Sequence, residues 1–128
     1  MFIAPQENYM FEVKDWCGRT VRLTRRTFET HKERHPEFTQ YIEAAKQTIQ
    51  DPDLVAEADN GGTSLVRFGL GRKPFGKLYL VVIVFYRGAE GTEATHHFTS
   101  RLGDLRIIET RHVWLAGKRF SLGGKSNE

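Results

Sequence analysis

"KLYLVVIVFYR", residues 77–87, is the stretch that decides the fold class. It is a run of apolar and β-branched residues of strand length, far too short to cross a bilayer. Glycine-containing turns flank it, and beyond them lie the strand-like segments "TSLVRFGL" at 63–70 and "TEATHHFTSR" at 92–101. Strand-like runs separated by such turns are typical of an antiparallel meander. We therefore expect 77–87 to be a central strand of a mainly antiparallel sheet, covered on one or both faces.

The first half of the chain adds a hairpin and two helices to this sheet. "YMFEVKD" at 9–15 and "TVRLT" at 20–24 are short strand-like runs around a turn. A helical pattern starts at Thr24, and Pro36 favours the start of a second helix because proline suits the first helical position. The second helix has an apolar stripe formed by Phe38, Tyr41, Ile42, Ala45 and Ile49.

The order of these elements predicts an α+β fold with an N-terminal hairpin and two consecutive helices packed on one face of the sheet. The segment "DLVAEA" at 53–58 is a candidate strand, whereas residues 103–120 are ambiguous between helix and strand. A chain of 128 residues fits one domain, 1–128, with its core at about 9–116.

Charge and cysteine content limit the classes of function. The net charge of +3 supports an anionic partner only weakly. Cys17 is the only cysteine, which excludes an intrachain disulfide and a thiolate metal cluster and favours a reducing compartment. The chain shows neither a signal-peptide pattern nor a membrane-spanning run, so we expect a cytoplasmic protein with no membrane partner.

A metal site is the first hypothesis for the histidines. His31 and His35 are four residues apart, the spacing that places two side chains on one helical face. However, the zinc-protease motif needs a glutamate directly after the first histidine, whereas here the glutamate is Glu33. Zinc would also require a third ligand such as His96 or His97. We therefore expect no metal and no cofactor.

Acid–base chemistry on RNA is the second hypothesis. Cleavage through the 2′-hydroxyl needs a base, an acid and a cation, which histidine and arginine supply. Because side chains alternate along a strand, His97, Thr99 and Arg101 share the side opposite Phe98. If Phe98 faces the core, these three line the open face, where Arg67 is a further candidate cation. The alternative is an ordinary solvated strand face.

Other polar residues allow two interpretations. His31 shares a face with Phe28, so it is either a chemical group or a hydrogen-bonded core histidine. His35, before a proline, is more typical of a helix junction. The basic turn "GLGRKPFG" at 69–76 contains Lys73, which we expect to contact a nucleic-acid backbone.

The segment "FETHKERHPEFTQYIEAAKQTIQDPDLV" at 28–55 resembles the helical half of ribonuclease-like domains of phages and mobile elements. These domains belong to the barnase–EndoU–colicin–RelE superfamily. The matching residues are Phe28, His31, Arg34, His35, Pro36, Glu37, Thr48, Pro52, Asp53 and Val55. A "hydrophobic–Thr–small" signature on the last meander strand is matched by Phe98, Thr99 and Ser100.

The resemblance covers roughly residues 20–101 and implies a metal-independent endoribonuclease, often directed at tRNA or mRNA. Position by position, it implies that His31 is catalytic, that Arg34 contacts phosphate and that Thr99 is catalytic or positioning. The sequence departs from the pattern at His97, where an aliphatic residue is usual, and at Arg101, where an aromatic one is common.

The leading hypothesis is thus a metal-independent endoribonuclease that cleaves by 2′-hydroxyl transesterification, of the kind found in toxins and phage-derived effectors. Its partners would be tRNA or mRNA and a cognate antitoxin or immunity protein. The candidate catalytic residues are His31, Thr99, Arg34 and His97, and the candidate RNA-binding residues are Arg101, Arg67, Ser100 and Lys73. We expect His31 to reach around the sheet edge and meet Thr99 in one hollow. The alternative is an inactive RNA- or protein-binding module of the same fold, and a third possibility is a zinc hydrolase.

Overall fold

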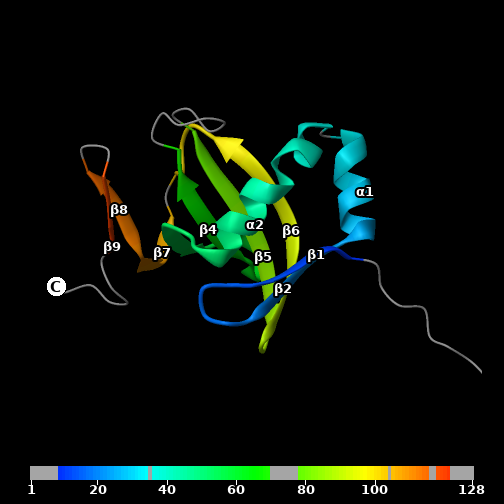
Figure 1. The fold of residues 1–128 in the computed structure, drawn as a ribbon, viewed down its shortest axis with the longest axis horizontal. Helices are drawn as coiled ribbons and strands as arrows, with labels where there is room; N and C mark the ends of the chain where they lie inside the picture. The colour runs from blue at the N-terminus through cyan, green and yellow to red at the C-terminus, as the bar shows by residue number, and fades with distance from the viewer. Residues whose placement is uncertain (1–8, 35, 70–77, 104, 116–117, 122–128) are drawn as a thin grey trace, which may run out of the picture.

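The described part of the chain is organised around one large sheet, shown in the computed structural model of Figure 1. The structure describes residues 9–34, 36–69, 78–103, 105–115 and 118–121. The strands are β1 (Tyr9–Lys14), β2 (Thr20–Thr24), β3 (Leu54–Glu57), β4 (Thr63–Phe68), β5 (Tyr79–Arg87), β6 (Glu90–Thr99), β7 (Arg106–Thr110), β8 (His112–Leu115) and β9 (Lys118–Ser121). The helices are α1 (Arg25–Arg34) and α2 (Ile42–Gln50), with short 3₁₀ helices η1 (Pro36–Tyr41) and η2 (Asp59–Gly61).

The large sheet has seven strands in the order β1-β2-β6-β5-β4-β3-β7. Its neighbouring strands are antiparallel except for β2 and β6, which run parallel. The apolar run at 77–87 contributes β5, the middle strand, as its composition predicts. The α+β class, with two helices and a mostly antiparallel sheet, is therefore confirmed. The parallel pair was not expected, because it joins strands that are distant in the sequence.

The helical region differs from its prediction in one respect. α1 begins after Thr24, whose Oγ1 accepts a hydrogen bond from the backbone N–H of Thr27 at 3.1 Å. The second α-helix begins at Ile42 rather than at Pro36, because residues Pro36–Tyr41 form the tighter η1. His35 lies outside the described residues. Within α2, Ala45 and Ile49 are fully buried against the sheet, as the apolar stripe predicts.

Apolar side chains pack on both faces of β5, which explains its unbroken apolarity. Leu80, Val82 and Val84 belong to the larger core cluster, which also contains Ala45 and Ile49 of α2. Figure 1 shows α2 lying across this face of the sheet. A smaller cluster lies on the opposite face. Its buried members are Leu54, Val66 and Val81, and the partly buried side chains packed against them are Phe68, Tyr79, Ile83, Leu102 and Leu105. Because alternate residues of a strand face opposite sides, this one segment supplies both clusters.

Asp15 attaches the β1–β2 pair to the centre of the sheet. Its buried carboxylate accepts hydrogen bonds from the backbone N–H groups of Cys17 and Arg19 at 2.9 and 2.8 Å. The same carboxylate forms an ion pair with the Arg19 guanidinium at 2.8 Å and accepts the Tyr86 hydroxyl at 2.8 Å. Arg19 also lies over the Tyr86 ring at 3.7 Å. The segment between β1 and β2 is thereby fixed to β5.

The ambiguous C-terminal region forms strands. β7 pairs with β3 as the last strand of the large sheet, while β8 and β9 pair in a separate two-stranded sheet. Nε2 of His112, a residue for which the sequence predicts no role, lies 2.8 Å from Oδ1 of Asp51. The backbone N–H of His112 donates to the Asp53 carbonyl at 3.1 Å, so this junction is fixed to the end of α2. No helix in the described ranges is long and apolar enough to cross a membrane.

Candidate nucleic-acid interface

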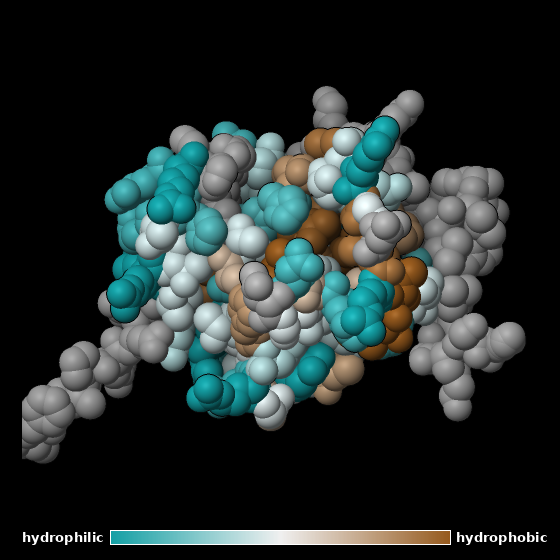
Figure 2. Space-filling view, turned by 180° about the vertical axis from the view of Figure 1, so that it is seen from behind, coloured by the Kyte–Doolittle hydropathy of each residue, from teal (hydrophilic) through white to brown (hydrophobic). Residues whose placement is uncertain are grey.

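The sheet face opposite α2 carries a hollow of about 560 Å³, which we call the open-face hollow. Its floor is apolar and is formed by Val66, Val81 and Ile83. Leu102 and Leu105 close one end. Figure 2 views this side of the molecule and shows apolar surface in the middle of the face with polar residues around it. The hollow therefore combines an apolar floor with a polar rim, which is typical of ligand sites.

His97 stands on the rim of the open-face hollow. It pairs with Val81 across the ladder, and so shares a face with the apolar floor rather than with the core under α2. Its side chain is exposed, but partial burial among the lining atoms lowers its pKa below the usual 6.5, and the neighbouring His96 lowers it further. A neutral imidazole is consequently the favoured form of His97 at neutral pH, and a neutral imidazole can accept a proton.

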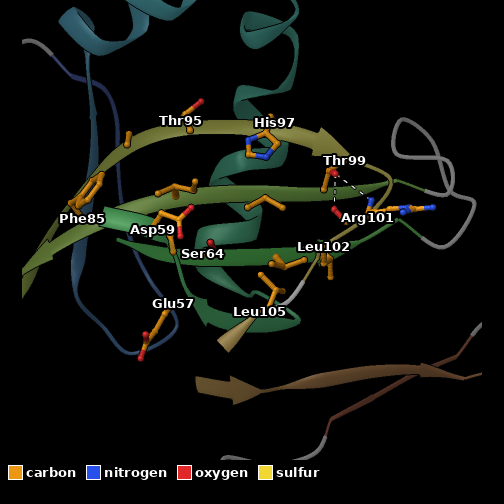
Figure 3. A pocket seen from close by; sticks show the side chains of 15 residues that line it. Glu57, Asp59, Ser64, Phe85, Thr95, His97, Thr99, Arg101, Leu102 and Leu105 are labelled. Atoms are coloured by element: carbon orange, nitrogen blue, oxygen red, sulfur yellow. Dashed lines mark hydrogen bonds between the residues drawn. The ribbon is translucent and has the colours of Figure 1, made fainter. Parts of the chain in front are cut away.

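Thr99 lines the same hollow, but its hydroxyl is engaged in a turn. The Thr99 Oγ1 donates to the Arg101 carbonyl at 2.7 Å and accepts the Arg101 backbone N–H at 3.2 Å, as Figure 3 shows. This local pattern is a side chain–backbone turn of the kind that ends strands. The Thr99 hydroxyl therefore holds the Arg101 backbone at the end of the hollow.

A second hollow, of about 490 Å³, lies between α1 and β6, and we call it the α1 hollow. His31 and Arg26 line it from α1, together with the hydroxyl-bearing Thr27 and Thr30. Thr92 lines it from β6. β2 pairs with β6 only from Glu90 to Thr92, so α1 flanks the part of β6 that β2 leaves unpaired.

A β-bulge connects the geometry of the two hollows. The ladder between β5 and β6 pairs Ile83 with Thr95 but Val84 with Glu93, which leaves Ala94 as an extra residue. Beyond such a bulge, alternation along the strand is reversed. Thr92 consequently pairs with Phe85. Phe85 and Ala94 line both hollows, so the hollows adjoin each other along β6.

The expected meeting of His31 and Thr99 is not found. His31 reaches the edge of the sheet, as expected, but it lines the α1 hollow, whereas Thr99 lines the open-face hollow. The two hollows have only the lining residues Phe85 and Ala94 in common. The expectation failed because α1 lies beside the bulged half of β6, while Thr99 is at the far end of the strand.

The position expected for Arg67 is also wrong. Its guanidinium donates to the Gln47 side chain of α2 at 2.9 Å, so it lies on the face that the helices cover. The reason is alternation along β4, which places Arg67 on the same side as the fully buried Leu65 of the main core. Arg34 and Ser100 are exposed and line neither hollow, and Lys73 lies outside the described residues.

Sequence reasoning missed two residues that the structure places at the site. Phe85 is 41 % exposed although it belongs to the most apolar run of the chain. Asp59, from η2, lines the open-face hollow beside it. Phe85 was missed because continuous apolarity gives no indication of which residues are uncovered, and Asp59 because it reaches the site from a turn.

Among the described residues, no three His, Cys, Asp or Glu side chains are grouped closely enough to hold a metal ion. No known protein family, curated protein or solved structure matches the chain.

Proposed function

We propose that this protein binds single-stranded RNA across the two adjoining hollows. We define the RNA face as the set of side chains that would contact the strand: Arg26, His31, Phe85, Thr92, His97 and Arg101. The observation that carries the proposal is the position of Phe85, an exposed aromatic ring between a histidine–arginine pair on α1 and another at the end of β6.

This arrangement suits the chemistry of an unpaired strand. Aromatic side chains on a sheet stack on unpaired bases, and flanking cations attract the phosphates on either side. The sequence pI of about 9.2 is consistent with an anionic partner. The resemblance of residues 20–101 to ribonuclease-like domains of the barnase–EndoU–colicin–RelE superfamily supports the same class of ligand. We extend the proposal to tRNA or mRNA in the cytoplasm, with an antitoxin that would cover this face.

RNA binding is tested by fluorescence anisotropy with a labelled single-stranded oligonucleotide and with the corresponding duplex. We expect the single strand to bind more tightly and binding to weaken steeply with added salt. Phe85→Ala should lower the affinity about 5- to 100-fold, as the loss of one stacked base does. Tyr9→Ala is the matched control, because Tyr9 is a similarly exposed aromatic on the edge strand β1. Equal affinity of wild type and Phe85→Ala would contradict the proposal.

A second candidate function is RNA cleavage on the same face, favoured by the lowered pKa of His97. Neutral His97 would remove the proton of a 2′-hydroxyl, and the 2′-oxygen would attack the adjacent phosphorus. The bond from phosphorus to the 5′-oxygen then breaks, and the leaving 5′-oxygen would take up a proton from solvent water. The products would be a 2′,3′-cyclic phosphate and a free 5′-hydroxyl.

Cleavage is tested with labelled RNA in the presence of EDTA, because this chemistry uses no metal. We expect a cyclic-phosphate product whose rate of formation falls about 10²- to 10⁴-fold in His97→Ala, with RNA binding largely retained. His96→Gln alters the adjacent but buried ring and serves as a control for unspecific effects. If purified wild type binds RNA without any product, the protein is a binding module and this second candidate is wrong.

A further inference from the structure

Asp59 places a carboxylate on a face otherwise suited to phosphate. It lies in η2, where its backbone carbonyl accepts the N–H of Gly62 at 3.4 Å. A Cβ atom added to Gly62 would lie 3.3 Å from the Phe85 ring, so the η2 turn packs directly beside this ring. Figure 3 shows the Asp59 carboxylate between Phe85 and Ser64, within the open-face hollow.

The neighbouring acidic residue is arranged differently. Glu57 also borders the hollow, but its side chain points away from it in Figure 3 and forms an ion pair with Arg106 at 3.5 Å. Within the described part of the chain, Asp59 has no such cation, and its side chain is exposed. Asp59 is therefore the acidic group of this face that a ligand beside Phe85 would meet.

A carboxylate repels phosphate, so it is useful at an RNA face only where a base presents N–H donors. Guanine presents two such donors side by side, N1–H and the N2 amino group, and they match the two oxygens of one carboxylate. Adenine and cytosine each offer one amino group. Uracil offers a single N–H between two carbonyl oxygens, and those oxygens are repelled by the carboxylate.

We propose that Asp59 and Phe85 form a base-recognition site that prefers guanine, with the base stacked on the Phe85 ring and its N1–H and N2 amino group donating to Asp59. This inference rests on the proposed RNA binding and adds base selectivity to it. The expected order of affinity is guanine first, then adenine and cytosine, and uracil last.

The test uses four RNA oligonucleotides of equal length that differ only in one central base within a uridine tract. Binding is measured by fluorescence anisotropy. We expect wild type to bind the guanine-containing oligonucleotide about 5- to 100-fold more tightly than the all-uridine one. In Asp59→Asn, which presents one acceptor and one donor, this ratio should fall below about 2-fold, while the all-uridine oligonucleotide binds as well as before or better.

Glu57→Gln is the matched control, because it removes one negative charge from the same rim and should leave the guanine preference unchanged. Asp59 is exposed, so both variants should fold, and thermal unfolding checks this. Equal binding of all four oligonucleotides by wild type, or a guanine preference that persists in Asp59→Asn, would overturn the inference and leave RNA binding intact. Absence of binding to any oligonucleotide would overturn the proposed function itself and this inference with it.

Discussion

Nδ1 of His96 lies 2.6 Å from Oε2 of Glu93, although alternation would place residues three apart on opposite faces of a strand. The extra residue Ala94 brings both side chains to the core face, where they are almost completely buried. The other Glu93 oxygen, Oε1, has no hydrogen-bond partner among the described residues. The bulge thus creates a buried polar pair beneath the α1 hollow, whereas His97 and Thr95 share the other face through ordinary alternation.

Removal of one member of this pair should destabilise the protein. His96→Ala leaves the buried Glu93 carboxyl unpaired and opens a cavity, and we expect the free energy of unfolding to fall by about 3–5 kcal/mol. His97→Ala, at the adjacent exposed position, should change it by less than about 0.5 kcal/mol. Urea denaturation of the two variants measures both values. Equal stabilities would show that the environments assigned to the two histidines are wrong.

The lowered pKa of His97 predicts a pH dependence. Because the folded state disfavours the protonated ring, the unfolded state binds more protons as the pH falls below 6.5. The associated stability is therefore fully present above pH 6.5 and is lost as the pH falls toward the folded-state pKa. The effect should be small, since solvent screens an exposed ring. An NMR titration of the His97 ring protons should give a midpoint below 6.5, and a midpoint at or above that value would contradict the prediction.

The Tyr86 hydroxyl should contribute to stability through Asp15. Tyr86→Phe removes the 2.8 Å hydrogen bond to the Asp15 carboxylate, and we expect a loss of about 1.5–3 kcal/mol, typical of a hydrogen bond to a charged group. Tyr79→Phe removes a hydroxyl from the same strand, β5, and should cost less. Chemical denaturation compares the two variants. If Tyr79→Phe were the more destabilising variant, the hydrogen bond between Tyr86 and Asp15 would not be the larger contribution to stability.

Tyr86 should also resist ionisation. Burial raises its pKa above the ordinary 10, and the hydrogen bond to Asp15 and the charge of Asp15 act in the same direction. The folded state therefore keeps this proton at pH values where the unfolded state loses it, so stability should decline as the pH rises above 10. Ultraviolet absorbance during an alkaline titration should show one tyrosine that ionises only on unfolding, and this signal should be absent in Tyr86→Phe.

Two arginines on opposite faces of the sheet provide a matched test of the RNA face. Arg101→Ala should weaken RNA binding and reduce the slope of log affinity against log salt by about 0.7, the value for one phosphate contact on a single strand. Arg67→Ala removes the same charge from the helix-covered face, where the side chain donates to Gln47, and should leave the slope unchanged. A larger decrease of the slope in Arg67→Ala than in Arg101→Ala would indicate that RNA binds to the helix-covered face of the sheet.

Gly91 provides a packing test at the base of β6. A Cβ at this position would lie 2.8 Å from both the Tyr86 ring and Val84, closer than real contacts allow. We expect Gly91→Ala to cost about 1–3 kcal/mol through overpacking. Gly103→Ala meets no neighbour within 4 Å but must adopt a φ of +71°, so it should cost only about 1 kcal/mol, from backbone strain alone. Thermal unfolding of the two variants separates these effects.

The sequence predicted more of the fold than of the site. The apolar run of β5, the turn at Gly88 between β5 and β6 and the stripe of α2 are local patterns, and each formed its expected element. The placement of His97, Thr99 and Arg101 around one hollow followed from simple alternation, because no bulge intervenes between Thr95 and Thr99. The same rule did not predict on which face Arg67 lies, because the face of β4 that the helices cover depends on packing between distant segments.

By itself, the sequence determined which segments become strands and helices, because hydrophobic period and turn chemistry act over a few residues. The tertiary structure alone decided the parallel pairing of β2 with β6, the bulge at Ala94 and the exposure of Phe85. These features depend on how distant segments share the two faces of one sheet, and a single extra residue in a ladder changes the side on which every residue beyond it lies. For this reason Asp59, Phe85 and His31 come to line two adjoining hollows only in the folded chain.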